Sequence, residues 1–516
     1  MRFPSNLSGL FQAAVAANPA APFIEGVDGR KFTYRDALAA SGRIANYLVS
    51  RGVEPGDRVA VQVEKSPEAV FLYLGAVRAG AVYLPLNTAY TDHELEYFVG
   101  DAGPRMVVCS PERRAGIEAI ASAHGAIVET LDPKGLGSII DGSKRLPDAF
   151  EDVDRGENDL AAILYTSGTT GRAKGAMLTQ RNLRSNAVTL AKLWRFTRDD
   201  VLIHALPIFH THGLFVALNV TLAAGSSVLL LPKFDAALIV QLFSRATVLM
   251  GVPTFYTRLL EQPGLDQAST RGMRLFVSGS APLSAETHTT WSARTGHAIL
   301  ERYGMTETNM NSSNPYEGKR KPGAVGFPLE GIEIRVADPE SGKPLPKGEV
   351  GGIEIRGPNV FKGYWKNPEK TAAEFRPDGF FISGDVGRFD DEGYLHIVGR
   401  AKDLIITGGY NVYPAEVEGE IEALDGVAEC AVVGLPDKDF GESVNAVVVR
   451  KQGSQLGHAD LISALARRLA RYKQPKRVFF VPALPRNAMG KIQKNVLREK
   501  LGPGGNPREL GVEGER

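Results

Sequence analysis

The segment at residues 165–175 is the densest group of potential phosphate ligands in the chain and reads YTSGTTGRAKG. It follows an apolar run, residues 160–165, that is typical of a buried strand. Glycines, hydroxyl side chains and a lysine can surround phosphate oxygens with N–H groups, O–H groups and positive charge. The pattern is not a Walker loop, because no Gly-Lys-Ser/Thr ends it. The candidate ligands are Thr166, Ser167, Gly168, Thr169, Thr170, Gly171 and Lys174.

Three charged residues further along the chain have types suited to nucleotide chemistry. Asp385, in a Ser-Gly-Asp turn, can accept hydrogen bonds from both hydroxyls of a ribose, and its charge strengthens them. Glu307 offers the hard oxygen that Mg²⁺ prefers. Lys491, in a Pro-x-x-x-x-Gly-Lys string, could offset the repulsion between a carboxylate and an α-phosphate, an effect of about 3–4 kcal/mol. Outside these contexts, a turn-capping Asp and a solvated Lys are the usual interpretations.

These segments, in this order, resemble the signature motifs of the adenylate-forming superfamily, which includes acyl- and aryl-CoA synthetases, luciferases and adenylation domains of peptide synthetases. The resemblance covers the chain up to its last residues. It implies that ATP activates a carboxylic acid as an acyl-adenylate and that CoA then takes the acyl group, with Mg²⁺ as the metal. The six matching motifs lie at residues 165–175, 278–282, 303–307, 383–385, 399–403 and 485–491.

The resemblance also implies individual roles. Lys491 is the implied catalytic lysine, with Glu307 and His210 as further catalytic residues. Thr166 and Glu307 are the implied Mg²⁺ ligands, although the Thr166 hydroxyl could instead make only a turn bond. The implied nucleotide-contacting residues beyond the phosphate loop are Gly279, Ser280, Ala281, Tyr303, Gly304, Met305, Thr306, Asp385, Arg400 and Lys491.

Strand and helix patterns predict an α/β fold with a large and a small domain, since 516 residues exceed one ordinary core. In residues 1–401, strand-like runs alternate with helix-like stretches, which predicts parallel-type sheets covered by helices. Short alternating strands at residues 348–398 predict an antiparallel β subdomain. Residues 402–501 predict a small α+β domain that carries the catalytic lysine. Residues 502–516, rich in glycine, proline and charge, are predicted to be a disordered tail.

The resemblance implies that the small domain is mobile. It would turn about Lys402 after the adenylate forms, because one site must serve two reactions. This motion would withdraw Lys491 and present Gly408 and Gly409 near the path of the CoA thiol.

The acid-binding residues are harder to assign. The segment HALPIFHTHG at residues 204–213 matches the family segment whose histidine lines the acyl pocket, and His210 aligns with that histidine. His212 could be a second pocket residue or only a structural neighbour. Other stretches, including ERYGMTETNMN at residues 301–311, resemble malonyl-CoA synthetases in particular.

A dicarboxylic acid brings a second carboxylate into the pocket, and its burial requires a cation and hydrogen-bond donors. Alternate residues of a strand share a face, so Arg274 and Ser278 could bind that carboxylate together. Arg274 could also be an ordinary arginine at a strand end. The remaining candidates for this carboxylate are His210, Arg302 and Arg320.

Composition argues against several other functions. Lys and Arg number 60 against 59 Asp and Glu, so no bulk positive field favours nucleic acid or anionic membranes. No apolar run spans a bilayer, and the two cysteines, Cys109 and Cys430, lie in apolar runs, so we expect a cytoplasmic protein with reduced thiols. The expected partners are malonate or a similar acid, ATP and CoA, and the resemblance adds a lysine acetyltransferase and deacetylase acting on Lys491. Alternatives are another acid, such as methylmalonate or benzoate, and the loading of a carrier protein.

Overall fold

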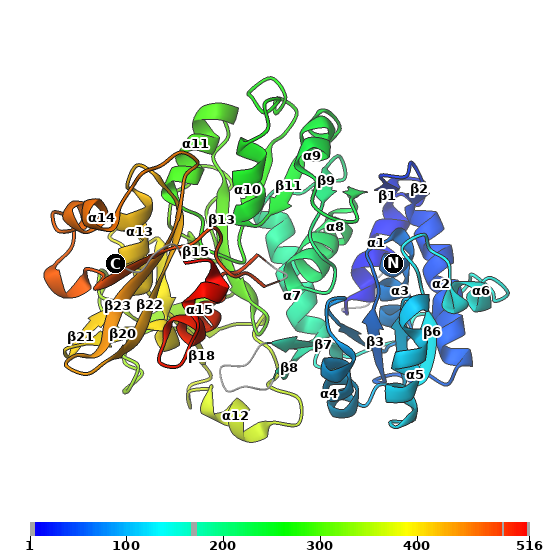
Figure 1. The fold of residues 1–516 in the computed structure, drawn as a ribbon. Helices are drawn as coiled ribbons and strands as arrows, with labels where there is room; N and C mark the ends of the chain where they lie inside the picture. Colours follow the sequence, from blue (N-terminus) through cyan, green and yellow to red (C-terminus); the bar gives the residue numbers. More distant parts are fainter. Residues whose placement is uncertain (1–5, 167–172, 488–489, 513–516) are drawn as a thin grey trace.

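The computed structural model describes residues 6–166, 173–487 and 490–512. Within these residues the chain forms four sheets: two mainly parallel, one antiparallel, and one in a small C-terminal part coloured orange and red (Figure 1). Helices cover the parallel sheets. The architecture confirms the predicted α/β fold with a large N-terminal part, a β subdomain and a small α+β C-terminal domain.

The first sheet has six described strands in the order β6-β5-β3-β4-β7-β8. Neighbouring strands are parallel except β7 and β8, which form an antiparallel hairpin. Strands covered on both faces need apolar side chains, and β4 and β5 are buried at every position. The elements are α2 (Tyr34–Ser50), β3 (Arg58–Gln62), α3 (Pro67–Arg78), β4 (Val82–Pro85), α4 (Asp92–Ala102), β5 (Met106–Cys109), η1 (Pro111–Arg113), α5 (Arg114–Ser122), β6 (Ile127–Thr130), α6 (Ser138–Ser143), β7 (Leu160–Thr166) and β8 (Lys174–Thr179).

The second sheet has nine described strands in the order β15-β14-β13-β12-β11-β9-β10-β1-β2. The strands from β13 to β1 are parallel, so the residues after β9, β12 and β13 meet at one edge. The elements are α1 (Ser8–Ala17), β1 (Pro22–Gly26), β2 (Lys31–Thr33), α7 (Gln180–Leu193), β9 (Val201–His204), the π-helix η2 (His212–Leu218), α8 (Asn219–Ala224), β10 (Ser227–Leu230), α9 (Ala236–Leu242), η3 (Phe243–Arg245), β11 (Val248–Gly251), α10 (Pro253–Leu260), β12 (Leu275–Ser278), α11 (Ala285–Thr295), β13 (Leu300–Met305), β14 (Asn309–Ser313) and β15 (Phe327–Pro328).

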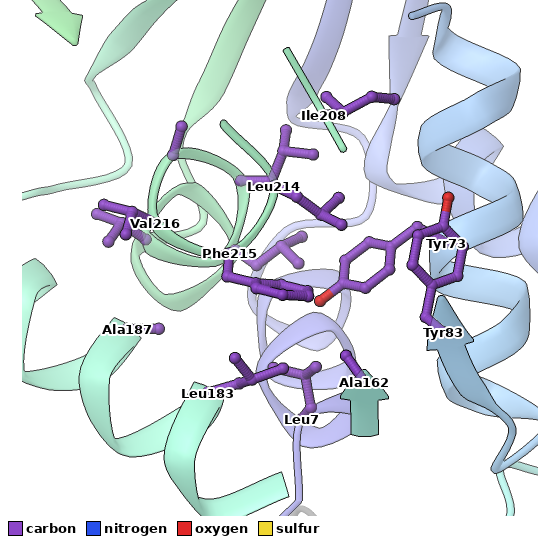
Figure 2. Packing of buried hydrophobic residues seen from close by; sticks show 14 of the residues in the cluster. Leu7, Tyr73, Tyr83, Ala162, Leu183, Ala187, Ile208, Leu214, Phe215 and Val216 are labelled. Atoms are coloured by element: carbon purple, nitrogen blue, oxygen red, sulfur yellow. The ribbon is translucent and has the colours of Figure 1, made fainter. Parts of the chain in front are cut away.

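One hydrophobic core joins the two sheets (Figure 2). Tyr73 of α3 points toward Phe215 of η2, with ring centroids 6.2 Å apart. The Tyr73 hydroxyl also donates to Oδ1 of Asn219 over 3.0 Å. Ala162 of β7 and Leu183 of α7 belong to the same cluster. The shared core therefore fixes η2, from the second half of the N-terminal part, against α3 from the first half.

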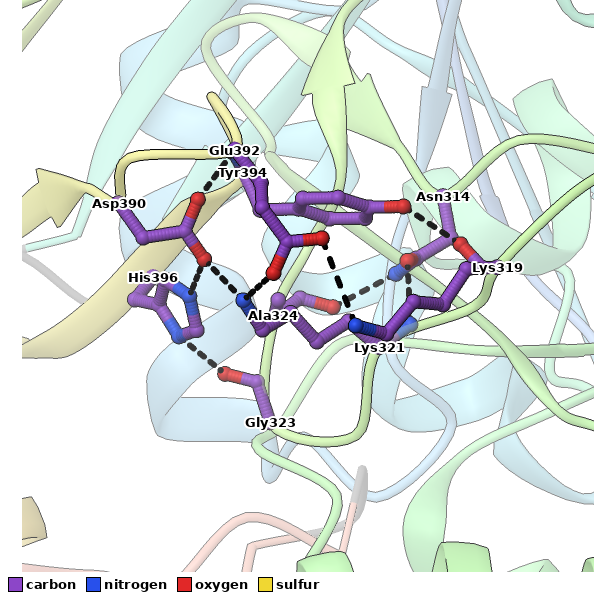
Figure 3. A network of polar contacts seen from close by, with 9 residues as sticks. All are labelled: Asn314, Lys319, Lys321, Gly323, Ala324, Asp390, Glu392, Tyr394 and His396. Atoms are coloured by element: carbon purple, nitrogen blue, oxygen red, sulfur yellow. Dashed lines mark hydrogen bonds and ion pairs between the residues drawn. The ribbon is translucent and has the colours of Figure 1, made fainter.

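The β subdomain is antiparallel, as predicted, in the order β16-β17-β18-β19. A polar network joins it to the loop after β14 (Figure 3). Nζ of Lys321 lies 2.6 Å from Oδ2 of Asp390 and 2.8 Å from Oε1 of Glu392, and Nε2 of His396 lies 2.8 Å from Asp390. These donors lower the pKa of Asp390 despite its desolvation. The elements are β16 (Glu333–Ala337), β17 (Gly351–Arg356), α12 (Pro368–Ala373), β18 (Phe381–Phe389) and β19 (Leu395–Arg400).

The C-terminal domain has two hydrophobic clusters of its own, one on each face of a sheet in which β22 and β23 are long antiparallel partners. Helix α14 packs Leu461 and Leu465 into one of these clusters and ends at Leu465. The elements are η4 (Ala401–Asp403), β20 (Ile405–Thr407), β21 (Tyr410–Val412), α13 (Pro414–Glu422), β22 (Val427–Asp437), β23 (Gly441–Arg450), α14 (His458–Leu465), η5 (Arg471–Lys473), β24 (Arg477–Phe480), α15 (Lys494–Leu501) and η6 (Pro507–Leu510).

The tail is not disordered where the structure describes it. Residues 502–512 include the short helix η6, and Leu510 and Val512 pack against the hydrophobic cluster that contains Leu501. Glu509 also pairs with Lys500. The prediction of disorder is wrong for these residues because two apolar side chains anchor a segment whose overall composition is polar.

Two further sequence expectations concern cysteines and membranes. Cys109 in β5 and Cys430 in β22 are buried free thiols, as predicted. Burial raises the pKa of Cys109 to about 11, so its thiol is protonated near neutral pH. None of the helices in the described ranges combines the length and the hydropathy needed to cross a bilayer.

Candidate active site

The predicted phosphate loop starts and ends at the hairpin of β7 and β8. Thr166 pairs with Lys174 across this hairpin, so the two ends of the loop are adjacent. Nζ of Lys174 lies 5.2 Å from the centroid of the Tyr364 ring. Ser167, Gly168, Thr169, Thr170 and Gly171, which were predicted to contact phosphate, lie outside the described residues.

Glu307 lies next to this hairpin through Tyr364. Oε1 of Glu307 accepts a hydrogen bond from the Tyr364 hydroxyl over 3.1 Å, and Oε2 of Glu374 lies 2.6 Å from the same hydroxyl. Glu307 is buried, forms no ion pair among the described residues, and has a pKa raised by that burial. A buried carboxylate without a cationic partner suits a bound cation. One carboxylate and a nearby Thr166 hydroxyl fit Mg²⁺, which keeps waters and phosphate oxygens in its shell.

Asp385, Arg400 and Tyr303 form a second polar group. Asp385 of β18 pairs in register with Arg400 of β19, and its Oδ1 lies 3.0 Å from Nε of Arg400. Oδ2 of Asp385 accepts a hydrogen bond from the Tyr303 hydroxyl over 2.6 Å. The charge of Asp385 is the main cause that raises the pKa of Arg400. Strand pairing therefore presents a fixed carboxylate beside Tyr303.

Two of the predicted nucleotide-contacting residues, Gly304 and Gly279, lie where a side chain would clash with neighbouring atoms. A Cβ on Gly304 would lie 2.0 Å from the carbonyl oxygen of Asn309, so only glycine fits between these strands. Met305 ends β13, and Thr306 begins the turn toward β14. A Cβ on Gly279, just after β12, would lie 2.4 Å from Cζ of Arg302. Gly279 is therefore the surface on which the Arg302 guanidinium rests.

Ser280 and Ala281 continue the turn after β12. Ser280 has a φ of 73°, an uncommon conformation for a residue with a side chain. Its Oγ lies 3.3 Å from Nδ1 of His212. This contact brings the predicted nucleotide-contacting turn to the beginning of η2, beside His210 and His212.

His210 and His212 are neutral and differ in their partners. The backbone N–H of His212 donates to Nδ1 of His210 over 3.3 Å, so the neutral His210 ring carries its proton on Nε2. Burial, with the positive charges of Lys491 and Arg302, lowers the pKa of His210 to about 3. Burial, with the nearby positive charge of Arg302, also lowers the pKa of His212 well below its usual value.

Several buried polar atoms beside these histidines have no hydrogen-bond partner among the described residues. They are Oγ of Ser278, Nε and Nη2 of Arg302, and Nε2 of His212. Arg302 is 3% exposed, and burial lowers its pKa to about 9. Its charge also lowers the pKa of both His210 and His212, which places the guanidinium close to both rings. The Arg302 charge and these unpartnered atoms can together bind a buried anion.

Lys491 reaches these groups from the C-terminal domain. Its backbone N–H donates to Oδ1 of Asn487 over 3.0 Å, and Nη1 of Arg486 donates to the Gly490 carbonyl oxygen over 2.5 Å. A Cβ on Gly490 would lie 3.3 Å from Oγ1 of Thr254 at the beginning of α10, so this segment rests on the N-terminal part. Figure 1 shows the red segment before α15 extending in that direction. Burial and Arg400 lower the pKa of Lys491 to about 8, while Asp385 and Glu307 oppose this effect.

Two arginines predicted to bind the second carboxylate are elsewhere. Nε and Nη2 of Arg274 each bind an oxygen of Asp200 over 2.7 Å, and Nη1 donates to the carbonyl of Trp194. Arg274 precedes β12, whereas Ser278 ends it, so about 13 Å of strand separates them. Arg320 donates to the carbonyl of Ala298, which precedes β13. Both side chains are engaged at the edge of the sheet opposite Ser278, so the proposal below does not place them at the second carboxylate.

The hinge and CoA residues remain predictions. Lys402 lies in η4, directly after β19. Gly408 and Gly409 have φ values of 56° and 82° and form the exposed turn between β20 and β21. The geometry agrees with a turn that requires glycine, but it does not bring these residues to the site described above.

Comparison with known proteins identifies the arrangement. The model of the AMP-binding enzyme family matches residues 11–365, and the model of the AMP-binding enzyme C-terminal domain matches residues 416–491. The crystal structure of ATP-bound MatB from Rhodopseudomonas palustris is 61% identical, covers 96% of this chain and 98% of that chain, and has a TM-score of 0.94. The apo crystal structure of MatB gives a TM-score of 0.84.

Two curated relatives are also similar over most of their length. Feruloyl-CoA synthase of Amycolatopsis sp is 38% identical over 92% of this chain and 95% of its own. The mitochondrial malonate–CoA ligase of Mus musculus is 35% identical over 93% of this chain and 88% of its own. The chain belongs to the AMP-binding enzyme family and is an AMP-forming acyl-CoA synthetase.

Proposed function

We propose that the chain is a malonate–CoA ligase, which converts malonate, ATP and CoA to malonyl-CoA, AMP and pyrophosphate through a malonyl-adenylate. The observation that carries the proposal is the buried guanidinium of Arg302, whose Nε and Nη2 have no partner among the described residues. A buried cation without a counter-charge is strongly unfavourable. A monocarboxylic acid would leave Arg302 unpaired, whereas a diacid pairs it. The identity to MatB and the malonate–CoA ligases among the relatives support the same acid.

The second carboxylate of malonate binds between Arg302, Ser278 and His212 in this proposal. Arginine can hold a carboxylate through two parallel N–H bonds, and Nε and Nη2 are a suitable pair for this geometry. The Ser278 hydroxyl and Nε2 of His212 supply further donors if the neutral His212 ring carries its proton on Nε2. Gly279 leaves room for the guanidinium to lie at this depth.

The reacting carboxylate is held near Nε2 of His210 and Lys491. Its oxygen attacks the α-phosphorus of ATP, and the bond to pyrophosphate breaks. Lys491 stabilises the negative charge of both reactants, and a pKa of about 8 leaves it mostly protonated at neutral pH. Asp385 and Arg400 bind the ribose, and the loop from Thr166 to Lys174 binds the phosphates. Mg²⁺, held by Glu307 and Thr166, neutralises phosphate charge when bound.

The second half-reaction forms the thioester. The CoA thiol attacks the malonyl carbonyl, and AMP leaves with the electron pair of the acyl–phosphate bond. Lys491 has no role in this step, so the C-terminal domain can turn at Lys402 and bring Gly408 and Gly409 to the thiol path. Separation of two steps by one domain movement is a recognised use of lid domains.

A panel of acids tests the proposal. Purified enzyme with ATP, Mg²⁺ and CoA should release pyrophosphate fastest with malonate among malonate, methylmalonate, succinate, benzoate and ferulate, and mass spectrometry should identify malonyl-CoA. Ferulate is included because a feruloyl-CoA synthase is among the relatives. Preferential turnover of benzoate or ferulate would contradict the assignment of malonate and leave the family assignment unchanged.

A further inference from the structure

Lys65 is a buried lysine that the chemistry above does not use. It lies between β3 and α3, directly before Ser66, whose Oγ caps α3 by accepting the N–H of Ala69. Its side chain is 6% exposed and forms no ion pair with any carboxylate in the described ranges. Burial alone holds the pKa of Lys65 well below its usual value. A buried amine without a counter-charge is costly, so its retention requires a reason.

The amine of Lys65 makes two hydrogen bonds, both to the segment that leads into the acid pocket. Nζ donates to the carbonyl oxygen of His204 over 3.1 Å and to that of Leu206 over 2.7 Å. His204 is the last residue of β9, in the second sheet, whereas Lys65 follows β3, in the first. The side chain therefore crosses between the two sheets to hold the start of the loop at residues 205–211.

The other end of the same loop is held by His204 itself. Nε2 of His204 lies 2.8 Å from the carbonyl oxygen of Gly213 in η2, and a carbonyl can only accept, so this nitrogen carries the proton. A Cβ on Gly213 would lie 2.1 Å from the carbonyl oxygen of Pro207, so the loop closes tightly on itself. His210 and His212 lie between these two fixed points. The position of the loop therefore determines whether the imidazole rings of His210 and His212 point into the pocket.

We propose that Lys65 is a positioning residue of the acid pocket, whose amine fixes the loop at residues 205–211 so that His210 and His212 face the bound acid. The nearby packing supports this role. Lys65 is anchored by α3, which is almost entirely buried, and α3 contacts η2 through Tyr73 and Phe215 (Figure 2). Because both bonds end on backbone carbonyls, the lysine sets the path of the chain while touching neither substrate nor nucleotide.

Replacement of Lys65 by methionine tests the proposal, because it keeps an unbranched side chain of similar volume and removes the amine that makes both hydrogen bonds. We expect KM for the acid to rise at least tenfold and KM for ATP to change less than twofold. The inference extends the proposed function to one more residue of the same pocket. The assay therefore uses whichever acid the wild-type enzyme prefers, so a failure of malonate as substrate would not count against Lys65.

Arg294→Met is the matched control. Arg294 of α11 also donates to backbone carbonyls only, those of Leu265, Leu260 and Gln262, but these belong to a different loop. We expect this variant to lower the Tm without changing the ratio of the two KM values. A Lys65→Met enzyme that likewise loses stability but keeps that ratio would overturn the proposal and leave Lys65 a purely structural residue.

A second variant covers the case in which Lys65→Met does not fold. Lys65→Gln keeps N–H donors on a shorter side chain, so it should shift the loop less. We expect a threefold to tenfold rise in KM for the acid, with KM for ATP unchanged. An unchanged KM for the acid in a folded Lys65→Gln enzyme, or equal rises in both KM values, would contradict the proposal.

Discussion

Replacing Arg302 with methionine should stabilise the free enzyme and abolish its use of malonate. Burial lowers the pKa of Arg302 from the usual high value of an arginine to about 9. A lowering of that size corresponds to about 5 kcal/mol of unfavourable free energy for the charged form. The unfolded chain binds the proton more tightly, so this penalty is complete below pH 9 and is lost as the pH rises from 9 toward the usual pKa of an arginine. Replacing a buried ion pair with apolar residues of similar volume is often neutral or stabilising by about 1–4 kcal/mol, and for the unpaired Arg302 we expect a gain in that range.

The same replacement, Arg302→Met, should lower catalytic activity although it raises stability. Without Arg302, the second carboxylate of malonate is buried without a cation, which costs about 3–5 kcal/mol. This corresponds to a loss of about 150-fold to 5,000-fold in kcat/KM for malonate. Urea denaturation gives the free energy of unfolding, and pyrophosphate release gives kcat/KM. Malonate alone should raise the Tm of the wild-type enzyme and not that of the variant.

Arg274→Met provides the control for this experiment. It removes an arginine of the same sheet that binds Asp200, so it should destabilise the fold by roughly 3 kcal/mol and leave kcat/KM for malonate within about threefold. The reasoning would be refuted if Arg302→Met were less stable than the wild type and retained malonate activity. It would also be refuted if Arg274→Met selectively lost that activity.

The other predictions concern Lys491, Gly279 and Tyr364. Adenylation, measured by pyrophosphate exchange, should decline as the pH rises through about 8, because the Lys491 ammonium loses its proton there and not near the usual value of 10.5. Lys491→Ala, or acetylation of Lys491, should abolish adenylation and leave conversion of synthetic malonyl-adenylate to the thioester intact; loss of both would contradict separate conformations. Gly279→Ala should reduce kcat/KM for malonate at least tenfold, since the new Cβ displaces Arg302; normal activity would exclude that contact. Tyr364→Phe should weaken Mg²⁺-ATP binding in calorimetry about threefold to tenfold by releasing Glu307; unchanged affinity would exclude this role.

Three motifs of the predicted nucleotide site can be placed from sequence because they lie at the ends of the strands β7, β12 and β13. Asp385 and Arg400 then meet through the pairing of β18 with β19. Alternation in a strand shows which residues share a face but not which end of the sheet they occupy. Arg274 and Ser278 share a face of this segment but lie at its opposite ends, whereas Arg302 lies one residue before Tyr303.

Contacts between distant residues could not be predicted. Tyr364 reaches Glu307 only because the segment after β17 folds back onto β8, where Ala176 and Tyr364 form a bridge. Lys65 stands in no recognisable motif, and its two carbonyl partners become visible only once both sheets are assembled. The order of residues 502–512 could not be predicted from composition, because the segment is polar on average although two apolar side chains anchor it.

The most direct test of the central claim compares malonate with propionate, which has the same three carbons and lacks the second carboxylate. Purified wild-type enzyme is assayed for pyrophosphate release with ATP, Mg²⁺ and CoA at saturating cosubstrates. If Arg302 binds the second carboxylate, kcat/KM for malonate should exceed that for propionate by at least about 150-fold. Equal values for the two acids would contradict a pocket built around that carboxylate.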